Sequence, residues 1–225
     1  MKMMKRYAIY YAPAEGPFAG AAACWLGRDA ATDRDVAQPA IAGCDLASLT
    51  DAPRRYGFHG TLKPPFRLTG TDPAGLEAAL TDVAAKQAPV MAGPLAVARI
   101  GHFLALVPAE PLAGIKALAA RVVEVFEPCR APLSEAEYAR RRPESLTARQ
   151  RALLDLYGYP YVMEEFRFHL TLTGPMDAGI PAVEAAARDW FAPYLTAPFR
   201  IADLCLFGED EAGLFHLLSR HALTG

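Results

Sequence analysis

Hydrophobic positions recur along this chain with two different periods, and each change of period marks the start of a new predicted element. Runs of aromatic and β-branched residues predict strands, and apolar residues repeating every three or four positions predict helices. The predicted strands cover residues 7–12, 56–68, two runs within 95–107, 164–175, 199–207 and 214–220. The predicted helices cover residues 19–26, about 41–49, 73–89, 111–126 and 181–195. Strands and helices recur in the same order around 56–68 and 164–175, which indicates an internal duplication.

A helical segment at about residues 130–161 interrupts this alternation. Ser134 with Glu137, and Thr147 with Gln150, have the spacing of capping boxes, in which the two side chains satisfy free N–H groups at the start of a helix. We therefore expect two short helices inserted into a duplicated fold.

Two of the predicted strands contain the same short pattern, Phe-His-x-Thr-Leu. It occurs at Phe58–Leu62 and again at Phe168–Leu172. A histidine followed two positions later by serine or threonine is expected by chance in about one chain in three of this composition. Two matches with the same flanking residues, both in strand-like sequence, are far harder to attribute to chance. The repeated pattern therefore marks these two strands as the functional candidates.

Side chains two positions apart lie on the same face of a strand. The polar residues that share a face in this way are His59, Thr61 and Lys63 in the first strand, and Arg167, His169, Thr171 and Thr173 in the second. Most of the intervening positions are apolar, so each strand is expected to have a core face and a polar face. A polar set of imidazoles, hydroxyls and cations suits a phosphate group.

Two histidines beside one phosphate can open a cyclic phosphodiester. A neutral imidazole accepts a proton from the attacking water, and a protonated imidazole donates one to the leaving alkoxide. His59 and His169 are the catalytic candidates, and the sequence leaves open which of them is the base. The residues expected to bind the phosphate are Thr61, Thr171, Lys63 and Arg167. This chemistry requires neither a metal ion nor a cofactor.

The two cations also have structural interpretations. Two prolines follow Lys63, and since they cannot donate hydrogen bonds to a neighbouring strand, Lys63 is a solvated lysine if the strand ends there. Arg167 is placed on a regular strand beside His169, and its alternative role is an ion pair with Glu165 or Asp177.

The insertion carries further groups with two interpretations. A solvated face is the first interpretation of Arg140–Arg142, and a lid over an anionic substrate is the second. Tyr157, Tyr159 and Tyr161 either stack on a base or sugar or pack the insertion against the rest of the chain, and packing is the commoner outcome.

The remaining aromatic and histidine candidates are expected to be structural. Tyr7 and Tyr11 share one face of the first strand with Ile9, where core packing is expected, although a tyrosine there is long enough to reach a cleft. The histidines outside the repeated pattern, expected in structural or surface positions, are His102, His216 and His221.

Composition limits the classes of partner. The 225-residue chain is 52% hydrophobic, and its net charge of -2 argues against non-specific binding to long nucleic acid. Cys24, Cys44, Cys129 and Cys205 lack zinc-site spacing and are expected as free thiols. The N-terminal apolar run stops at Pro13, too short for a signal peptide, and no stretch approaches the roughly 20 apolar residues of a membrane span. We expect a cytoplasmic protein with no membrane partner.

The chain resembles members of the 2H (two-histidine) phosphoesterase superfamily, which carry two H-x-[ST]-x motifs. Here the motifs are His59-Gly60-Thr61-Leu62 and His169-Leu170-Thr171-Leu172. The stretches RYGFHGTLKPPFRL, GYPYV and EEFRFHLTLTGP further resemble an uncharacterised bacterial subfamily associated with phosphonate-utilisation genes. The resemblance covers most of the chain, with the insertion outside the common core.

The resemblance implies a bilobal, duplicated α+β fold over residues 1–225, in which two antiparallel-rich sheets face a central cleft with helices outside. It also implies metal-independent opening of a cyclic nucleotide or a ribose cyclic phosphate, with His59 and His169 as the catalytic pair and Thr61 and Thr171 at the phosphate. The implied partner is a small phosphorylated metabolite or nucleotide. The sequence does not predict the oligomeric state.

Two other functions stay open from sequence. One is an enzyme that processes RNA ends carrying a 2′,3′-cyclic phosphate or joins RNA, although the chain lacks an extended basic stripe. The other is a binding protein that holds a phosphorylated metabolite without turnover, although binding alone does not require a matched acid and base.

Overall fold

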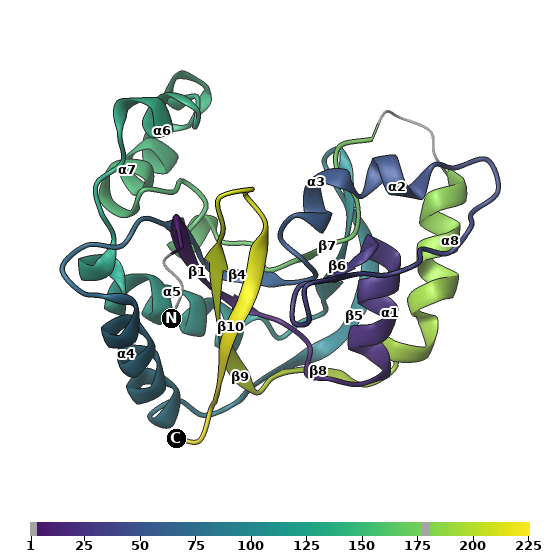
Figure 1. Ribbon diagram of the computed structural model, residues 1–225, viewed down its shortest axis with the longest axis horizontal. Helices are drawn as coiled ribbons and strands as arrows, with labels where there is room; N and C mark the ends of the chain where they lie inside the picture. The colour runs from purple at the N-terminus through teal and green to yellow at the C-terminus, as the bar shows by residue number, and fades with distance from the viewer. Residues whose placement is uncertain (1–3, 177–180) are drawn as a thin grey trace.

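The computed structural model describes residues 4–176 and 181–225, and it places eight strands in one curled antiparallel sheet (Figure 1). The strand order is β10-β9-β1-β4-β7-β6-β5-β8. These strands are β1 (Arg6–Tyr11), β4 (Gly60–Phe66), β5 (Val90–Ile100), β6 (Phe103–Pro108), β7 (Leu170–Thr171), β8 (Pro198–Ile201), β9 (Asp203–Glu209) and β10 (Phe215–Ala222). β2 (Arg28–Asp29) and β3 (Arg34–Asp35) form a separate hairpin. The α+β class is confirmed, and the two expected sheets are joined into one.

Two groups of helices pack against the sheet, and two further helices stand apart from it at one corner. They are α1 (Pro17–Leu26), α2 (Leu46–Leu49), α3 (Asp51–Arg54), α4 (Pro73–Ala85), α5 (Ala113–Val125), α6 (Glu135–Ala139), α7 (Ala148–Tyr157) and α8 (Pro181–Phe191). Figure 1 shows α1 beside α8 on one side and α4 beside α5 on the other, with α6 and α7 standing apart. None of the helices in the described ranges is long and apolar enough to cross a membrane.

The chain repeats one order of elements. Strand, helix, histidine strand, helix and strand occur in this order as β1, α1, β4, α4 and β5, and again as β6, α5, β7, α8 and β9, with shorter elements between some of them. The last strand of each repeat pairs in the other half of the sheet, because β5 lies beside β6 and β9 lies beside β1. The two halves are therefore interlocked, and each half depends on strands from both repeats.

The two halves meet where β4 pairs with β7, and we call this contact the seam. Gly60 is opposite Leu170 in an antiparallel register. A Cβ atom at Gly60 would lie 2.4 Å from the ring of Phe168 and 3.1 Å from the Leu170 side chain. Since real Cβ contacts are essentially never below 3.0 Å, a side chain at this position would displace the Phe168 ring. Glycine is thus required for close packing between the two histidine strands.

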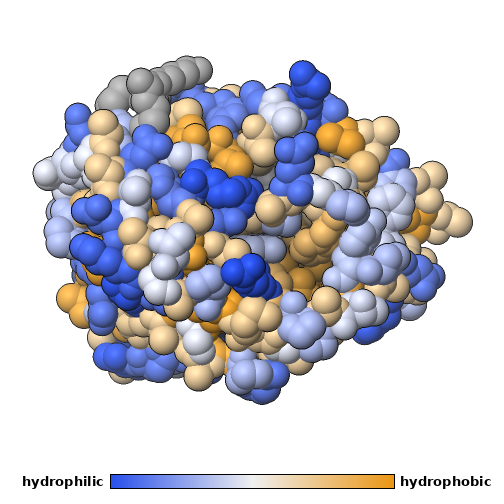
Figure 2. All heavy atoms as spheres, turned by 90° about the horizontal axis from the view of Figure 1, so that it is seen from below, coloured by the Kyte–Doolittle hydropathy of each residue, from blue (hydrophilic) through white to orange (hydrophobic). Residues whose placement is uncertain are grey.

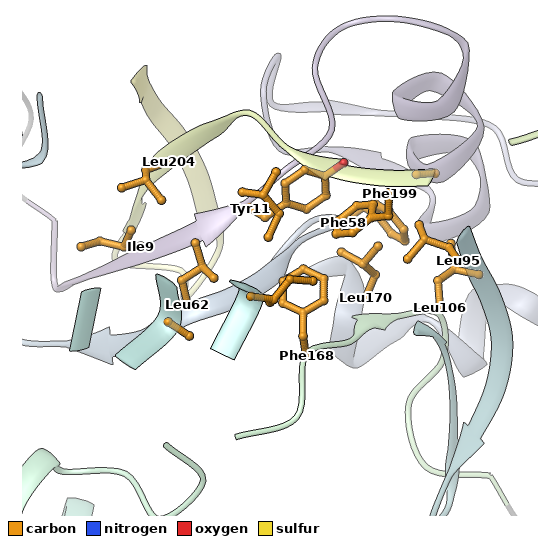
Figure 3. Close-up of a cluster of buried hydrophobic side chains, with 14 of the residues drawn as sticks. Ile9, Tyr11, Phe58, Leu62, Leu95, Leu106, Phe168, Leu170, Phe199 and Leu204 are labelled. Carbon is orange, nitrogen blue, oxygen red and sulfur yellow. The ribbon is translucent and has the colours of Figure 1, made fainter. Parts of the chain in front are cut away.

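The hydrophobic core is continuous beneath the seam. Figure 3 shows Tyr11, Phe168 and Phe199 converging from different elements. The Tyr11 and Phe199 rings lie edge to face with centroids 4.9 Å apart, and Phe168 lies 5.5 Å from Phe199. The outer face seen in Figure 2, in contrast, carries hydrophilic and apolar residues interspersed, as is usual for a protein surface. The stabilising apolar contacts therefore run between the halves.

A β-bulge lets β4 pass through its two prolines. Tyr7 pairs with Phe66 and Ile9 with Lys63, so two residues of β4 oppose one residue of β1 at this point. These two residues of β4 are Pro64 and Pro65, which have no N–H to donate to the ladder. The strand predicted over residues 56–68 is thereby confirmed as a continuous element, although it starts only at Gly60.

Capping residues predicted the starts of helices correctly, whereas the lengths of the apolar runs predicted the extents of elements less well. Both predicted capping boxes are present, at the starts of α6 and α7. The helix expected at about 41–49 is instead two short turns, α2 and α3, separated by Thr50. The strand expected over 199–207 is interrupted at Ala202 between β8 and β9. The second histidine strand has only two residues in ladder geometry, so most of 164–175 is irregular.

We predict that Gly60→Ala destabilises the fold, because the added methyl group overlaps the buried Phe168 ring. The expected loss in the free energy of unfolding is about 1–3 kcal/mol, measured by urea denaturation. Gly20→Ala in α1 is the control, since nothing lies within 4 Å of its Cβ position and alanine favours a helix. Equal stability of Gly60→Ala and wild type would contradict the close packing at the seam.

Candidate active site

The burial of side chains alternates through both repeated motifs, as the sequence predicted. The phenylalanine, the residue between histidine and threonine, and the leucine of each motif are buried in the core. The residues turned the other way and partly exposed are His59, Thr61, His169 and Thr171. The two motifs thus present the same pair of side chains on the same face of the sheet.

The seam fixes how these four side chains sit relative to one another. Because Gly60 is opposite Leu170, each motif histidine lies opposite the threonine of the other motif. His59 and His169 are therefore on one diagonal of the group and the threonines are on the other. Diagonal neighbours on antiparallel strands are typically roughly 7–8 Å apart, which leaves room for a phosphate between the two imidazoles.

Both imidazoles are held by the same backbone contact. Nδ1 of His59 lies 2.9 Å from the carbonyl oxygen of Gly57, and Nδ1 of His169 lies 2.8 Å from that of Arg167. A carbonyl oxygen only accepts, so in each ring Nδ1 is the protonated donor and Nε2 is left for the cleft. The contact two residues back along each strand thus sets tautomer and orientation together.

The surroundings of the two histidines differ. The His59 ring stacks on Tyr10 with centroids 4.0 Å apart, and Tyr56 lies on it at 5.7 Å. Burial lowers the pKa of His59 to about 4, against the opposing effect of its bond to Gly57, and the nearby His169 lowers the pKa further. His59 is therefore neutral at physiological pH, with Nε2 free to accept a proton.

The environment of His169 is more open. Its nearest described ring is Phe103, tilted by 50° with centroids 5.5 Å apart, and its hydrogen bond to Arg167 is exposed, whereas that of His59 to Gly57 is partly buried. The two halves thus repeat the backbone of the site but not the aromatic cover over the imidazole.

Two adjoining hollows form the cleft. The first hollow, about 390 Å³, is lined by His59 and Thr171, and the second hollow, about 710 Å³, is lined by His169 and Arg167. Thr61 lines both. Within the described part of the chain neither threonine hydroxyl has a hydrogen-bond partner, so both can bind a ligand oxygen. The structure brings together every predicted site residue except Lys63.

Lys63 lies outside these two hollows. It is 1% exposed, and its ammonium donates to the carbonyl of Val123 and to Glu127, each at 3.1 Å. The strand alternation that placed it beside His59 breaks just before it, because adjacent residues of β1 pair with Thr61 and Lys63 and leave Leu62 as an extra residue of β4. Thr173, four residues after the other histidine, is buried in the same way and accepts a bond from the Leu104 N–H. Burial lowers the pKa of Lys63, and Glu127 partly offsets this.

Arg167 is exposed at the edge of the second hollow, on the same side as His169. Of the two carboxylates considered as its ion-pair partners, Glu165 accepts a hydrogen bond from Gln150 at 2.9 Å, and Asp177 lies outside the described residues. Its place in the cleft wall fits a role in orienting an anionic substrate.

The sequence interpretation missed Arg6 and Tyr10, which line the first hollow from β1. It considered the face of Tyr7 and Tyr11, and those residues pack in the core as expected. The alternation within β1 was a sufficient signal for Tyr10, had the neighbour of the first histidine strand been known. Strand order, which places β1 beside β4, is what the sequence did not supply.

The other histidines and the cysteines are not gathered into a second site. His216 lies 2.9 Å from Asp210, and His221 lies 3.0 Å from the hydroxyl of Thr81, as surface and structural groups would. The imidazole of His102 is at the edge of the second hollow. In residues 4–176 and 181–225, no three His, Cys, Asp or Glu side chains are grouped so as to hold a metal ion.

The chain is similar in sequence to a described protein family and to two named proteins. A family described as "Protein of unknown function (DUF1045)" matches residues 61–216. The chain is 41% identical over 220 residues to "Ribose 1,5-bisphosphate phosphokinase PhnN" of Janthinobacterium sp. (strain Marseille), covering 93% of this chain and 49% of that protein. It is 36% identical over 218 residues to the protein of the same name from Laribacter hongkongensis (strain HLHK9), covering 96% and 51%. The chain thus spans about half the length of these relatives.

Solved structures similar to the chain include one described as a phosphoesterase, with a TM-score of 0.45, 13% identity and coverage of 99% and 100% of the two chains. Another is E. coli LigT complexed with 3′-AMP, with a TM-score of 0.44, 15% identity and the same coverage. Identities and scores of this size carry no argument about activity, which rests on the geometry of the cleft.

We predict that His59 titrates at a pKa of about 4 in NMR spectra of the imidazole ring, because its aromatic cover excludes water. Tyr10→Leu should raise this pKa toward the ordinary value by admitting water, whereas Tyr161→Leu, which removes a ring packed on Tyr159, should leave it unchanged. Titration of wild-type His59 at about 6.5 would contradict the argument.

The lowered pKa of His59 also makes the stability of the fold depend on pH. Between about pH 6.5 and 4 the unfolded chain binds a proton at this position more readily than the folded one, so the free energy of unfolding falls as the pH falls through that range. His59→Gln should flatten this part of the pH–stability curve.

Proposed function

The chain belongs to the DUF1045 family, and we propose that it is a phosphodiesterase that opens a small cyclic phosphodiester by two-histidine acid–base catalysis. The observation that carries the proposal is the seam, which sets two imidazoles and two threonine hydroxyls, unpartnered among the described residues, around two hollows that share Thr61. Both imidazoles turn Nε2 away from their backbone partners, as proton transfer to and from a ligand requires.

In the proposed reaction His59 is the general base and His169 the general acid. Water attacks phosphorus and loses its proton to Nε2 of the neutral His59. The ring P–O bond breaks on the opposite side, and the departing oxygen takes a proton from Nε2 of His169, leaving a phosphate monoester. The assignment rests on the aromatic cover, which disfavours a charged His59, whereas the described ring beside His169 is the tilted Phe103 at 5.5 Å.

The threonine hydroxyls bind the non-bridging oxygens of the phosphate. Thr61 and Thr171 reach the phosphate from the two sides of the seam, where they are aimed before the substrate arrives. Arg167 adds positive charge from the rim of the second hollow. Lys63 has no direct part, since its ammonium anchors β4 to Glu127 and to the C-terminal end of α5.

A ribose cyclic phosphate is the proposed substrate class. The relatives are named as kinases of ribose 1,5-bisphosphate, and hydrolysis of a cyclic phosphate on a ribose ring yields a ribose phosphate of that kind. The kinase step itself is not proposed for this chain, because its 225 residues contain no G-x-x-x-x-G-K-[ST] phosphate-binding motif and it spans half of the relatives. A place in phosphonate metabolism follows from the resemblance to the phosphonate-associated subfamily.

We predict that His59→Ala and His169→Ala each reduce ring opening by about 10²- to 10⁴-fold. The assay is phosphorus NMR of cyclic phosphates, nucleotide and ribose alike, with EDTA present throughout. His221→Ala is the matched control, because this histidine lies on β10 and its hydrogen-bond partners among the described residues are Thr81 and Ser219. Equal turnover by wild type and both motif variants would reject the proposal, and tight binding without any turnover would favour a binding protein.

A change of leaving group tests the assignment of acid and base. A phosphodiester that releases nitrophenolate does not need a proton donor, so His169→Ala should recover most of its lost activity on such a substrate. His59→Ala should not recover, because water still needs a base. Recovery by His59→Ala instead would reverse the two roles.

A further inference from the structure

A second cavity, of about 210 Å³, lies beside the cleft between β4 and the inserted helices. Six of its lining side chains are cations, and we call it the arginine cavity. They are Arg6, Lys63, Arg67, Arg130, Arg140 and Arg141. Arg6, Tyr56, Pro64, Pro65 and Arg141 also line the first hollow of the cleft, so the two spaces share a wall.

Three carboxylates partner some of these cations. Arg67 pairs with Glu137 at 3.0 Å, and Arg6 pairs with Glu209 at 2.5 Å. A third carboxylate, Glu127, is shared between two cations, Lys63 at 3.1 Å and Arg130 at 2.6 Å. These contacts hold the insertion and α5 against β4.

The other two arginines of the cavity, Arg140 and Arg141, take no part in these ion pairs. Within the described residues no carboxylate pairs with Arg140 or Arg141, and Arg140 donates only to the carbonyl of Ala136, at 3.3 Å. The cavity therefore carries more positive charge than its carboxylates compensate, which favours an anion.

Arg141 links the cavity to the cleft. Its guanidinium lies over the ring of Tyr159, 4.8 Å from the centroid, and Tyr159 lines both hollows of the cleft. This stacking fixes the planar group at the shared wall, where its N–H donors can meet an anion beside the catalytic space.

We propose that the arginine cavity binds a phosphate monoester carried by the same small molecule whose cyclic phosphodiester lies between His59 and His169. The inference rests on the proposed function and narrows it to substrates with two separate phosphate groups. Guanidinium groups suit a monoester dianion, because they donate paired hydrogen bonds to two of its oxygens. The insertion, which supplies Arg140 and Arg141 just after the end of α6, would thus determine specificity.

The test compares kcat/KM for adenosine 2′,3′-cyclic phosphate with and without a 5′-phosphate. Wild type should prefer the 5′-phosphorylated compound by about tenfold or more, and Arg140→Met with Arg141→Met should remove that preference. Arg142→Met is the matched control, since the adjacent Arg142 does not line the cavity, and it should keep the preference. A wild type with no preference, or a double variant that keeps it, would overturn the proposal while leaving the phosphodiesterase assignment intact.

A binding measurement separates this inference from the catalytic one. Calorimetry with ribose 5-phosphate and with ribose should show binding of the phosphorylated sugar only, lost in the double variant and kept in His169→Ala. This result would support the cavity even if no cyclic phosphate were turned over. A short RNA ending in a 2′,3′-cyclic phosphate offers phosphodiesters instead of a monoester, and its preferential cleavage through Arg140 and Arg141 would overturn the monoester assignment.

Discussion

The pairing of Gly60 with Leu170 is the contact on which the rest of the site depends. It joins the two halves of the sheet, and it does so at the middle residue of each motif. A shift of this register by one residue would turn one histidine and its threonine into the core, because side chains alternate along a strand. The absence of a side chain at Gly60 is what allows Phe168 to pack beneath the contact. The same contact is therefore needed both for close packing of the core and for alignment of the site.

Duplication explains why the two motifs look alike, and their neighbours explain why they can act differently. Each imidazole donates from Nδ1 to the carbonyl two residues earlier, so the backbone alone sets the same orientation twice. Tyr10 then covers one ring closely, whereas the other has only the tilted Phe103 ring near it. The proposed acid and base are thus two equivalent residues that differ in the solvation of one of them.

Local patterns in the sequence predicted the elements, both capping boxes and the alternation around each histidine. The error at Lys63 has a physical cause, because a register shift at Leu62 changes which way its side chain turns, and no local pattern reports a partner strand. Tyr10 was missed for a related reason, since its position beside His59 depends on β1 lying next to β4. Strand order depends on contacts between residues that are far apart in the sequence. The arginine cavity depends on such contacts too, because it forms where the insertion packs.

Because β5 and β9 each pair in the other half of the sheet, the order of synthesis determines when each half can form. Arg6 and Tyr10 of β1 pair with Glu209 and Cys205 of β9, so the first half of the sheet cannot close until residue 209 has left the ribosome. Contacts this distant in sequence form slowly. A nascent chain already carries His59 with its motif long before that point, but the sheet that supports Tyr10 is still incomplete. Premature release should therefore yield chains that lack an organised cleft rather than partly active ones.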